Sequence, residues 1–292
     1  MEAALRETLS RVLGERCELH VLRPVSGGCI HRCYAIETSE GPYFLKLSDP
    51  AHGPTLIAEA DGLQALHAAG MRVPSVIAQG EVGDQRFLLL EYLDLVRSTA
   101  ASQWALGRSL AQLHTHALAD RYGWHTSNFI GLTPQANAWH EDWTAFWLSQ
   151  RLRPQLKRAA ANGHTGSLQT LGERFMEALP ALLGGHRPPA ALLHGDLWGG
   201  NAGTLADGSP VIFDPAAYYG DPEADLAMTE LFGGFRPEFY AGYREVRAID
   251  PGYAVRKHVY NLYHVLNHLN LFGGGYRQQA EQLMRRLLAE VR

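Results

Sequence analysis

The stretch LLHGDLWGGNAG, residues 192–203, decides how the rest of the chain is interpreted. It brings a histidine, a carboxylate, a tryptophan, two glycines and a carboxamide into one short run after apolar residues. A second stretch, VIFDPAAYYGD at 211–221, places Asp214 directly after another apolar run. We expect Asp214 to project from the end of that strand into the same cleft as Asp196 and Asn201.

This spacing fits a site for phosphoryl transfer. Such a site needs a carboxylate beside the attacking hydroxyl, oxygen ligands for Mg²⁺ and a cation on the phosphates. Asp196 is the predicted catalytic carboxylate, and Asn201 and Asp214 are the predicted Mg²⁺ ligands. An aspartate, an asparagine five positions later and a further aspartate form the pattern of kinase catalytic and metal loops.

Residues that suit ATP binding precede this run in the required order. Lys46 lies in a predicted strand, Glu59 in the helix that follows can pair with it, and Ser-Gly-Gly at 26–28 can cover the phosphates. Backbone groups near 88–93 can meet an adenine edge. The predicted ATP-contacting residues are Gly27, Gly28, Lys46, Glu59, Glu91 and Leu93.

Each of these features has a simpler explanation when it is taken alone. Lys46 fits an edge-strand lysine, Glu59 a solvated helix carboxylate, and Ser-Gly-Gly an ordinary turn. Asp214-Pro215 fits a plain strand end. Their joint occurrence in the order that a kinase needs favours the catalytic interpretation.

The pattern of apolar residues, taken with these motifs, predicts an α+β, protein-kinase-like fold with two lobes, residues 1–93 and 94–292. The first lobe is expected to be a five-stranded antiparallel sheet with one helix after Pro54, preceded by a short amphipathic helix that ends at Gly14. The second is expected to be mainly helical, with a hinge near 91–95. Its predicted helices are 102–118, 138–160, 167–183, 223–232, 236–247, 253–271 and 275–291, with short strands at 190–194 and 210–214.

Composition excludes several classes of protein. The 292 residues carry a net charge of −4 without a basic run, so we expect no nucleic-acid partner. No apolar stretch is long enough to span a bilayer, and the charged N-terminal residues do not resemble a signal peptide. Three cysteines without a CxxC pair indicate free thiols in a reducing cytoplasm.

A protein kinase is not the expected class. Gly195 stands where a catalytic-loop arginine would be, and Pro215 follows the metal aspartate in place of Phe-Gly. A helix is predicted to begin near Pro222, which leaves no room for a long activation segment. The open cleft over Asp196 therefore suits a small substrate.

The sequence resembles the fructosamine kinase (ketosamine kinase) family, a branch of the small-molecule kinases that includes aminoglycoside and choline phosphotransferases. The resemblance extends from Gly27 to Tyr276, and HGDLW and the two longest segments are its most specific parts. The stretches that carry it are HGDLWGGN, FDPAAYYGDPEADLAM (213–228), LFGGF (231–235), YGWHTSNFIGLTPQANAWHEDW (122–143) and RKHVYNLYHVLNHLNLFGGGY (256–276).

The resemblance implies ATP-dependent phosphorylation of a sugar hydroxyl, commonly O3, in ketoamines such as ribulosamines or fructosamines. The phosphorylated adduct decomposes and frees the amine, so the implied role is deglycation of small amines or of glycated lysines on proteins. A monomer or weak dimer is expected. Trp198, Asp221 and His194 are the candidate substrate contacts, and Asp225 is expected to fasten the catalytic loop.

Several alternatives stay open at this point. The acceptor is a ketoamine or another amine-bearing molecule of the aminoglycoside or choline type, and a nucleotide-binding pseudokinase is a third interpretation. Gln135, Asn137 and Trp139 either line the substrate site or organise a loop. His31 departs from the small residue of many relatives in the glycine loop, and Cys29 is either a redox-active thiol or an inert one.

Overall fold

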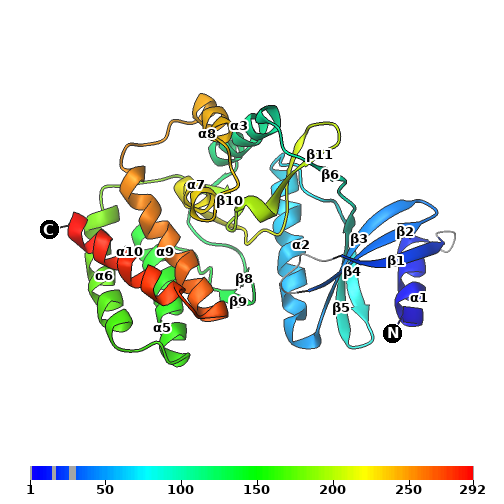
Figure 1. The fold of residues 1–292 in the computed structure, drawn as a ribbon, viewed down its shortest axis with the longest axis horizontal. Coiled ribbons are helices and arrows are strands. Elements are labelled where there is room, and N and C mark those ends of the chain that lie inside the picture. Colours follow the sequence, from blue (N-terminus) through cyan, green and yellow to red (C-terminus); the bar gives the residue numbers. More distant parts are fainter. Residues whose placement is uncertain (1, 15–17, 26–30, 292) are drawn as a thin grey trace.

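The computed structural model describes residues 2–14, 18–25 and 31–291, which form two lobes side by side (Figure 1). Gly27, Gly28 and Cys29 lie outside the described residues, so the predictions made for them stay predictions. The first lobe contains α1 (Glu2–Leu13), β1 (Leu19–Val25), β2 (Arg32–Thr38), β3 (Gly41–Ser48), η1 (Pro50–His52), α2 (Gly53–Ala68), β4 (Val76–Val82) and β5 (Gln85–Glu91).

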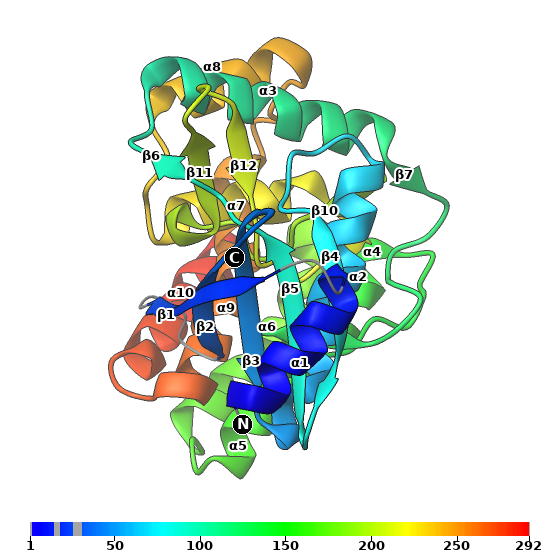
Figure 2. The same ribbon diagram turned by 90° about the vertical axis from the view of Figure 1, so that its right-hand side faces the viewer.

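The five strands of this lobe form one antiparallel sheet in the order β1-β2-β3-β5-β4. Side chains alternate between its two faces, as strand geometry requires. Leu89 packs in the cluster with Leu5 and Leu9 of α1, whereas Leu88 packs in the cluster with Leu56 of α2. The two helices thus cover opposite faces of the sheet (Figure 2). The predicted sheet and both predicted helices are confirmed.

The second lobe is mainly helical. Its longer helices are α3 (Ala100–His116), α5 (Arg153–Ala161), α6 (Ser167–Leu183), α7 (Pro222–Leu231), α8 (Pro237–Val246), α9 (Tyr253–Phe272) and α10 (Tyr276–Glu290). Helix α9 packs on α7 and α10, and α3 crosses α8 closely because Gly107 and Gly242 lack side chains. Hydrophobic residues from these helices form the largest core cluster of the protein.

Short strands occur in the segments that connect these helices. Strand β10 (Ala190–Leu193) lies between β7 (Leu118–Ala119) and β13 (Tyr218–Gly220). Strand β11 (Ala202–Leu205) pairs with β12 (Pro210–Ile212) and with β6 (Leu95–Val96), and β8 (Asn128–Ile130) pairs with β9 (Thr133–Gln135). Because β6 belongs to this lobe, the chain crosses between the lobes at 92–94.

The predicted helix over 138–160 is wrong in its first part. Asp142 caps the helix by accepting a hydrogen bond from the backbone N–H of Ala145, so α4 (Trp143–Phe146) begins there. A π-helical turn, η2 (Trp147–Leu152), then leads into α5, where Pro154 stands in the first turn. Pro154 has no backbone N–H to donate to the preceding turn, and the regular α-helix is interrupted by the π-helical turn directly before it.

Candidate active site

A sharp turn after β10 presents the candidate catalytic aspartate. Gly195 has φ +83°, and a Cβ on it would lie 2.1 Å from the carbonyl oxygen of Ala216. The same two segments are joined by a hydrogen bond from the N–H of Ala216 to the carbonyl of His194, at 2.8 Å. Only glycine satisfies both the positive φ and the close backbone approach, which explains Gly195 in the HGD run.

Asp225 of α7 holds this turn from behind. Its two carboxylate oxygens accept the backbone N–H groups of His194 and Gly195, each at 2.8 Å. Burial opposes the ionisation of this carboxyl, but its hydrogen bond with His114 and the backbone donors outweigh burial and lower the pKa of Asp225. The prediction that Asp225 fastens the catalytic loop is confirmed.

His194 contributes to the turn and not to a substrate pocket. Its side chain is fully buried, Nε2 donates to the carbonyl of Phe213 at 2.9 Å, and Nδ1 accepts the N–H of Asp196 at 3.2 Å. Burial lowers the pKa of His194, so the ring is neutral at pH 7. The expected substrate contact is corrected, because both ring nitrogens bind the chain itself.

Asn201 lies against Asp196 at the end of the η3 turn (Gly199–Asn201). Its amide nitrogen donates to the carbonyl of Asp196 at 2.9 Å and lies 3.4 Å from Oδ2 of that carboxylate. With its nitrogen engaged, the amide presents its oxygen as a ligand for a cation.

Burial, and then the neighbouring carboxylates of Asp214 and Asp225, raise the pKa of Asp196 to about 7.

Lys46 joins the sheet lobe to this site. Its Nζ lies 2.7 Å from Oε1 of Glu59 and 2.5 Å from Oδ1 of Asp214. Burial alone would lower the pKa of Lys46, but the two carboxylates outweigh it and raise that pKa, so the amine stays charged. The lysine of β3, the glutamate of α2 and the aspartate after β12 therefore meet at one point.

Asp214 is the one residue other than glycine with positive φ, at +57°, in the part of the chain that the structure describes. Such backbone strain is typical of functional sites. Its side chain is 47% exposed, so the carboxylate keeps access to the cleft while Lys46 is almost fully covered. Burial opposes its ionisation, but Lys46 outweighs burial and lowers the pKa of Asp214.

The structure therefore brings Lys46, Asp196, Asn201 and Asp214 together, as the sequence predicts. Besides its contact with Asp196, the Asn201 amide nitrogen lies 3.5 Å from the carbonyl oxygen of Asp214. Asn201 and Asp214 carry oxygen atoms of the hard type that Mg²⁺ prefers as ligands. Asp196 has the shifted pKa of a group that exchanges a proton near neutrality.

The predicted adenine contacts are Glu91, which ends β5, and Leu93, which follows shortly after it. The N–H of Glu91 donates to the carbonyl of Ser75, and its carboxylate forms a two-pronged ion pair with Arg72 at 2.5 and 2.8 Å. The carbonyl of Arg72 also accepts the N–H of Ile212, so this arginine links the end of β5 to β12. The N–H of Glu91 is thus already engaged, and the adenine contact through backbone groups of Glu91 and Leu93 stays a prediction.

His31 stands at the edge of the glycine loop. Its Nε2 lies 2.9 Å from Oγ1 of Thr55, whose hydroxyl donates to the carbonyl of His52. Burial, and then the charge of Lys46, lower the pKa of His31 to about 4. The ring is therefore neutral at pH 7 and is held against α2.

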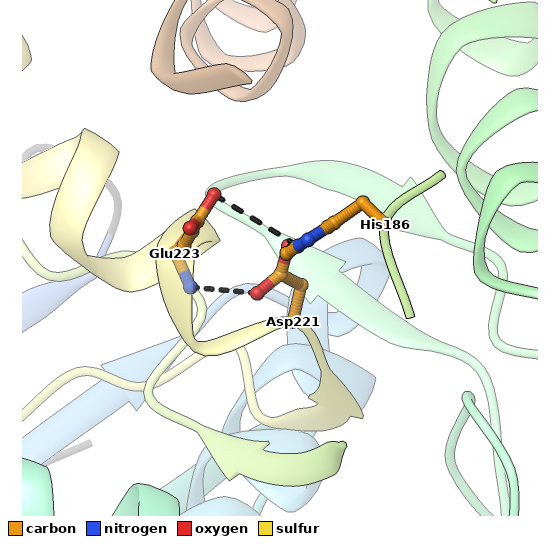
Figure 3. Close-up of side chains that lie close together, drawn as sticks. All are labelled: His186, Asp221 and Glu223. Atoms are coloured by element: carbon orange, nitrogen blue, oxygen red, sulfur yellow. Dashed lines mark hydrogen bonds and ion pairs between the residues drawn. The ribbon is translucent and has the colours of Figure 1, made fainter. Parts of the chain in front are cut away.

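The expected substrate contact Asp221 is also corrected. Its side chain is 1% exposed and caps α7 by accepting the N–H of Glu223 at 3.0 Å. It also binds His186 at 2.7 Å (Figure 3) and, in addition, the hydroxyl of Tyr260. Both oxygens of Glu223 bind Arg256 of α9, at 2.7 Å each. These contacts of Asp221 and Glu223 fix α7 onto α9. They thereby also hold Asp225, the residue of α7 that anchors the catalytic loop.

Trp198 keeps the exposure that a substrate contact needs. It is 40% exposed, and its indole covers Gly200, where a Cβ would lie 2.3 Å from the ring. Gly199 approaches the backbone of Gly233 and Gly234, so the LFGGF segment borders the catalytic loop. Trp198 therefore lies on the surface beside the catalytic aspartate and remains a candidate platform.

The open question about the 122–143 segment is answered for Gln135 and Asn137. Gln135 donates to the carbonyl of Ala216 at 3.2 Å and to Asn128, whose own amide donates to Ala217 at 2.7 Å. Asn137 donates to the same Asn128 oxygen. These buried amides organise the loop and support the segment that follows Asp214.

His114 supports the catalytic loop without any signal in the sequence. From α3 it reaches the carboxylate of Asp225 at 3.3 Å, across a separation of 111 positions, and it is itself bound by the hydroxyl of Tyr243 of α8 at 2.9 Å. Such contacts depend on how the helices pack, so no local motif reports them.

The sheet lobe with its Lys46–Glu59 pair and the helical lobe with Asp196, Asn201 and Asp214 define a phosphotransferase of the kinase type. The fold agrees, because an aminoglycoside phosphotransferase, solved as a ternary complex with ADP and hygromycin B, matches 98% of each chain with a TM-score of 0.69 at 13% identity. This likeness establishes the two-lobed, protein-kinase-like architecture.

The sequence comparisons are more specific. The fructosamine kinase family model matches residues 1–290. A probable ketoamine kinase of Synechocystis is 44% identical over 97% of this chain and 96% of its own length, and a chloroplastic protein-ribulosamine 3-kinase of rice is 38% identical over 93% and 80%. The solved structure of a putative fructosamine-3-kinase from Thermobifida fusca covers 98% of both chains, with 31% identity and a TM-score of 0.87. The chain belongs to the fructosamine kinase family and is a kinase.

No helix among the described residues is long and apolar enough to cross a membrane.

Proposed function

We propose that this kinase transfers the γ-phosphoryl group of ATP to a sugar hydroxyl, O3, of a ketoamine such as a ribulosamine or fructosamine. The observation that carries the proposal is the meeting of Lys46, Asp196, Asn201 and Asp214 at one site. Membership of a family with relatives named ketoamine kinase and protein-ribulosamine 3-kinase supports the choice of acceptor.

Lys46 is the proposed phosphate ligand. Its amine is charged and buried, and Glu59 directs it toward the side of the cleft where Asp214 lies. A fixed cation in a site of low dielectric stabilises the charge that develops on the phosphates. Gly27 and Gly28 are proposed to cover the phosphates, and the backbone near Leu93 to meet the adenine.

Asn201 and Asp214 fit a Mg²⁺ ion. The Asn201 nitrogen is engaged with Asp196, which leaves the amide oxygen as a ligand, and the half-exposed Asp214 carboxylate has access to the cleft. A Mg²⁺ ion held by these two residues would neutralise negative charge on the phosphates.

Asp196 is the proposed proton acceptor. As the sugar oxygen forms its bond to the γ-phosphorus, the bond to the bridging oxygen of ADP breaks and the hydroxyl proton passes to Asp196. A carboxyl whose pKa is raised to about 7 can take up and release a proton near neutral pH, which suits this exchange. Asp225 keeps the carboxylate in place through the backbone of the turn.

Trp198 is the proposed platform for the sugar, since an exposed indole beside the catalytic carboxylate offers a flat apolar face. The phosphorylated ketoamine would decompose and release the amine, so the product is a deglycated amine. Small ketoamines and glycated lysines on proteins are both proposed acceptors. The cytoplasm is the proposed location of the reaction.

A panel of acceptors tests this proposal. The enzyme with MgATP is offered ribulose-lysine, fructose-lysine, kanamycin and choline, and ADP release is measured for each. We expect turnover with one or both ketoamines. Turnover confined to kanamycin or choline would overturn the choice of acceptor, and MgATP binding without turnover of any of the four would favour a pseudokinase.

A further inference from the structure

Helix α2 touches both lobes of the kinase. Glu59 on this helix binds Lys46 of the sheet, and three positions later Gly62 lies against the segment that follows Asp214. A Cβ at Gly62 would lie 3.0 Å from Cγ of Pro215. The helix that aims the phosphate-binding lysine is therefore also in contact with the metal loop.

Between these two residues of α2, Asp61 makes a contact of a different kind. Its Oδ2 accepts a hydrogen bond from Nε1 of Trp124 at 2.8 Å and lies 3.1 Å from Nε2 of His125. Both partners come from the helical lobe, in the segment between β7 and β8. Hydrogen bonds to a charged acceptor are stronger than neutral ones.

Trp124 is a firm anchor for this bond. The indole is buried, its ring lies 5.4 Å from that of Tyr219, and its backbone N–H donates to the carbonyl of Asn137 at 3.0 Å. His125, in contrast, is largely exposed, so water screens its pairing with Asp61. The Trp124 hydrogen bond is therefore the part of this contact that holds α2.

We propose that Asp61 is a positioning residue: its bond to Trp124 holds α2 where Glu59 meets Lys46, and so couples the helical lobe to phosphate binding. Asp61 itself does not touch the reacting groups. Movement of α2 away from the helical lobe would withdraw Glu59 from Lys46 and leave the lysine directed by Asp214 alone.

Calorimetric titration with MgATP tests this proposal without a ketoamine, so it is independent of the acceptor. Asp61→Ala and Trp124→Phe are each expected to weaken MgATP binding about tenfold, the effect of losing one hydrogen bond to a charged group. The double variant is expected to lose about tenfold as well, because both changes remove the same bond. Gln64→Ala, on an exposed position of the same helix, is the control and should bind as the wild type.

Asp61→Asn supplies the conservative variant, since an amide oxygen can still accept from the indole. It is expected to bind MgATP within about threefold of the wild type. Thermal unfolding shows whether each variant is folded. Unchanged MgATP affinity in folded Asp61→Ala would overturn the proposal, and so would losses that multiply to about a hundredfold in the double variant.

Discussion

Replacing Gly195 by alanine should disable the enzyme through the shape of one turn. The new Cβ would lie 2.1 Å from the carbonyl oxygen of Ala216, where a carbon–oxygen contact needs about 3.3 Å, so the segments must part by roughly 1 Å. The positive φ of +83° adds roughly 1–2 kcal/mol, and the lost Ala216–His194 hydrogen bond about 1 kcal/mol. We expect a loss of about 3 kcal/mol in the free energy of unfolding.

The loss of activity should be larger than the loss of stability implies. A displacement of about 1 Å at a catalytic group costs on the order of a hundredfold in rate. Gly208 is the matched control, because it has φ +86° in the β11–β12 turn but a Cβ placed on it would meet nothing within 4 Å. Gly208→Ala should lose roughly 1–2 kcal/mol and keep its turnover. Chemical denaturation and steady-state kinetics measure both; equal turnover in the two variants would refute the reasoning.

Three further predictions concern the charged groups of the site. Because Asp196 accepts a proton when ionised and its pKa is raised to about 7, kcat/KM should rise about tenfold per pH unit below pH 7 and level off above it; a flat profile from about pH 5.5 to 8 would contradict this. Asp225→Asn keeps an amide oxygen for one of the two backbone N–H groups but sets its NH₂ donor against the other. It should cost about 3 kcal/mol in chemical denaturation, whereas a loss below about 1 kcal/mol would argue against the anchoring role of Asp225. Lys46→Met should lower kcat/KM for ATP by at least about a hundredfold in steady-state kinetics, and a near-normal value would remove Lys46 from the phosphate site.

Most helices and strands are predictable because the sequence patterns that indicate them are local. The strands of the first lobe and helices such as α6 follow apolar periodicity with clear glycine and proline boundaries. The four central site residues were found because each occupies a fixed place relative to a strand, a turn or a helix. Among the short strands, β10 and β12 follow from their apolar runs, whereas β7 and β13, of two and three residues, are too short to show a period.

The errors concern side chains with distant partners. The position of Asp221 shortly after Asp214 predicts a substrate contact, but His186 and Tyr260 bind its side chain from 35 and 39 positions away. His194 belongs to the catalytic motif, yet both of its ring nitrogens bind backbone groups. These groups are the N–H of Asp196 and the carbonyl of Phe213, which lies just before Asp214. Proximity in sequence identifies the loop but not the direction of each side chain.

The central claim is that Asp196 performs the proton exchange within a site assembled by both lobes. The most direct measurement is the turnover of Asp196→Asn on ribulose-lysine, together with its affinity for MgATP by calorimetry. We predict a loss of about a thousandfold or more in kcat, with MgATP affinity within about twofold of the wild type. Turnover close to that of the wild type would contradict the account.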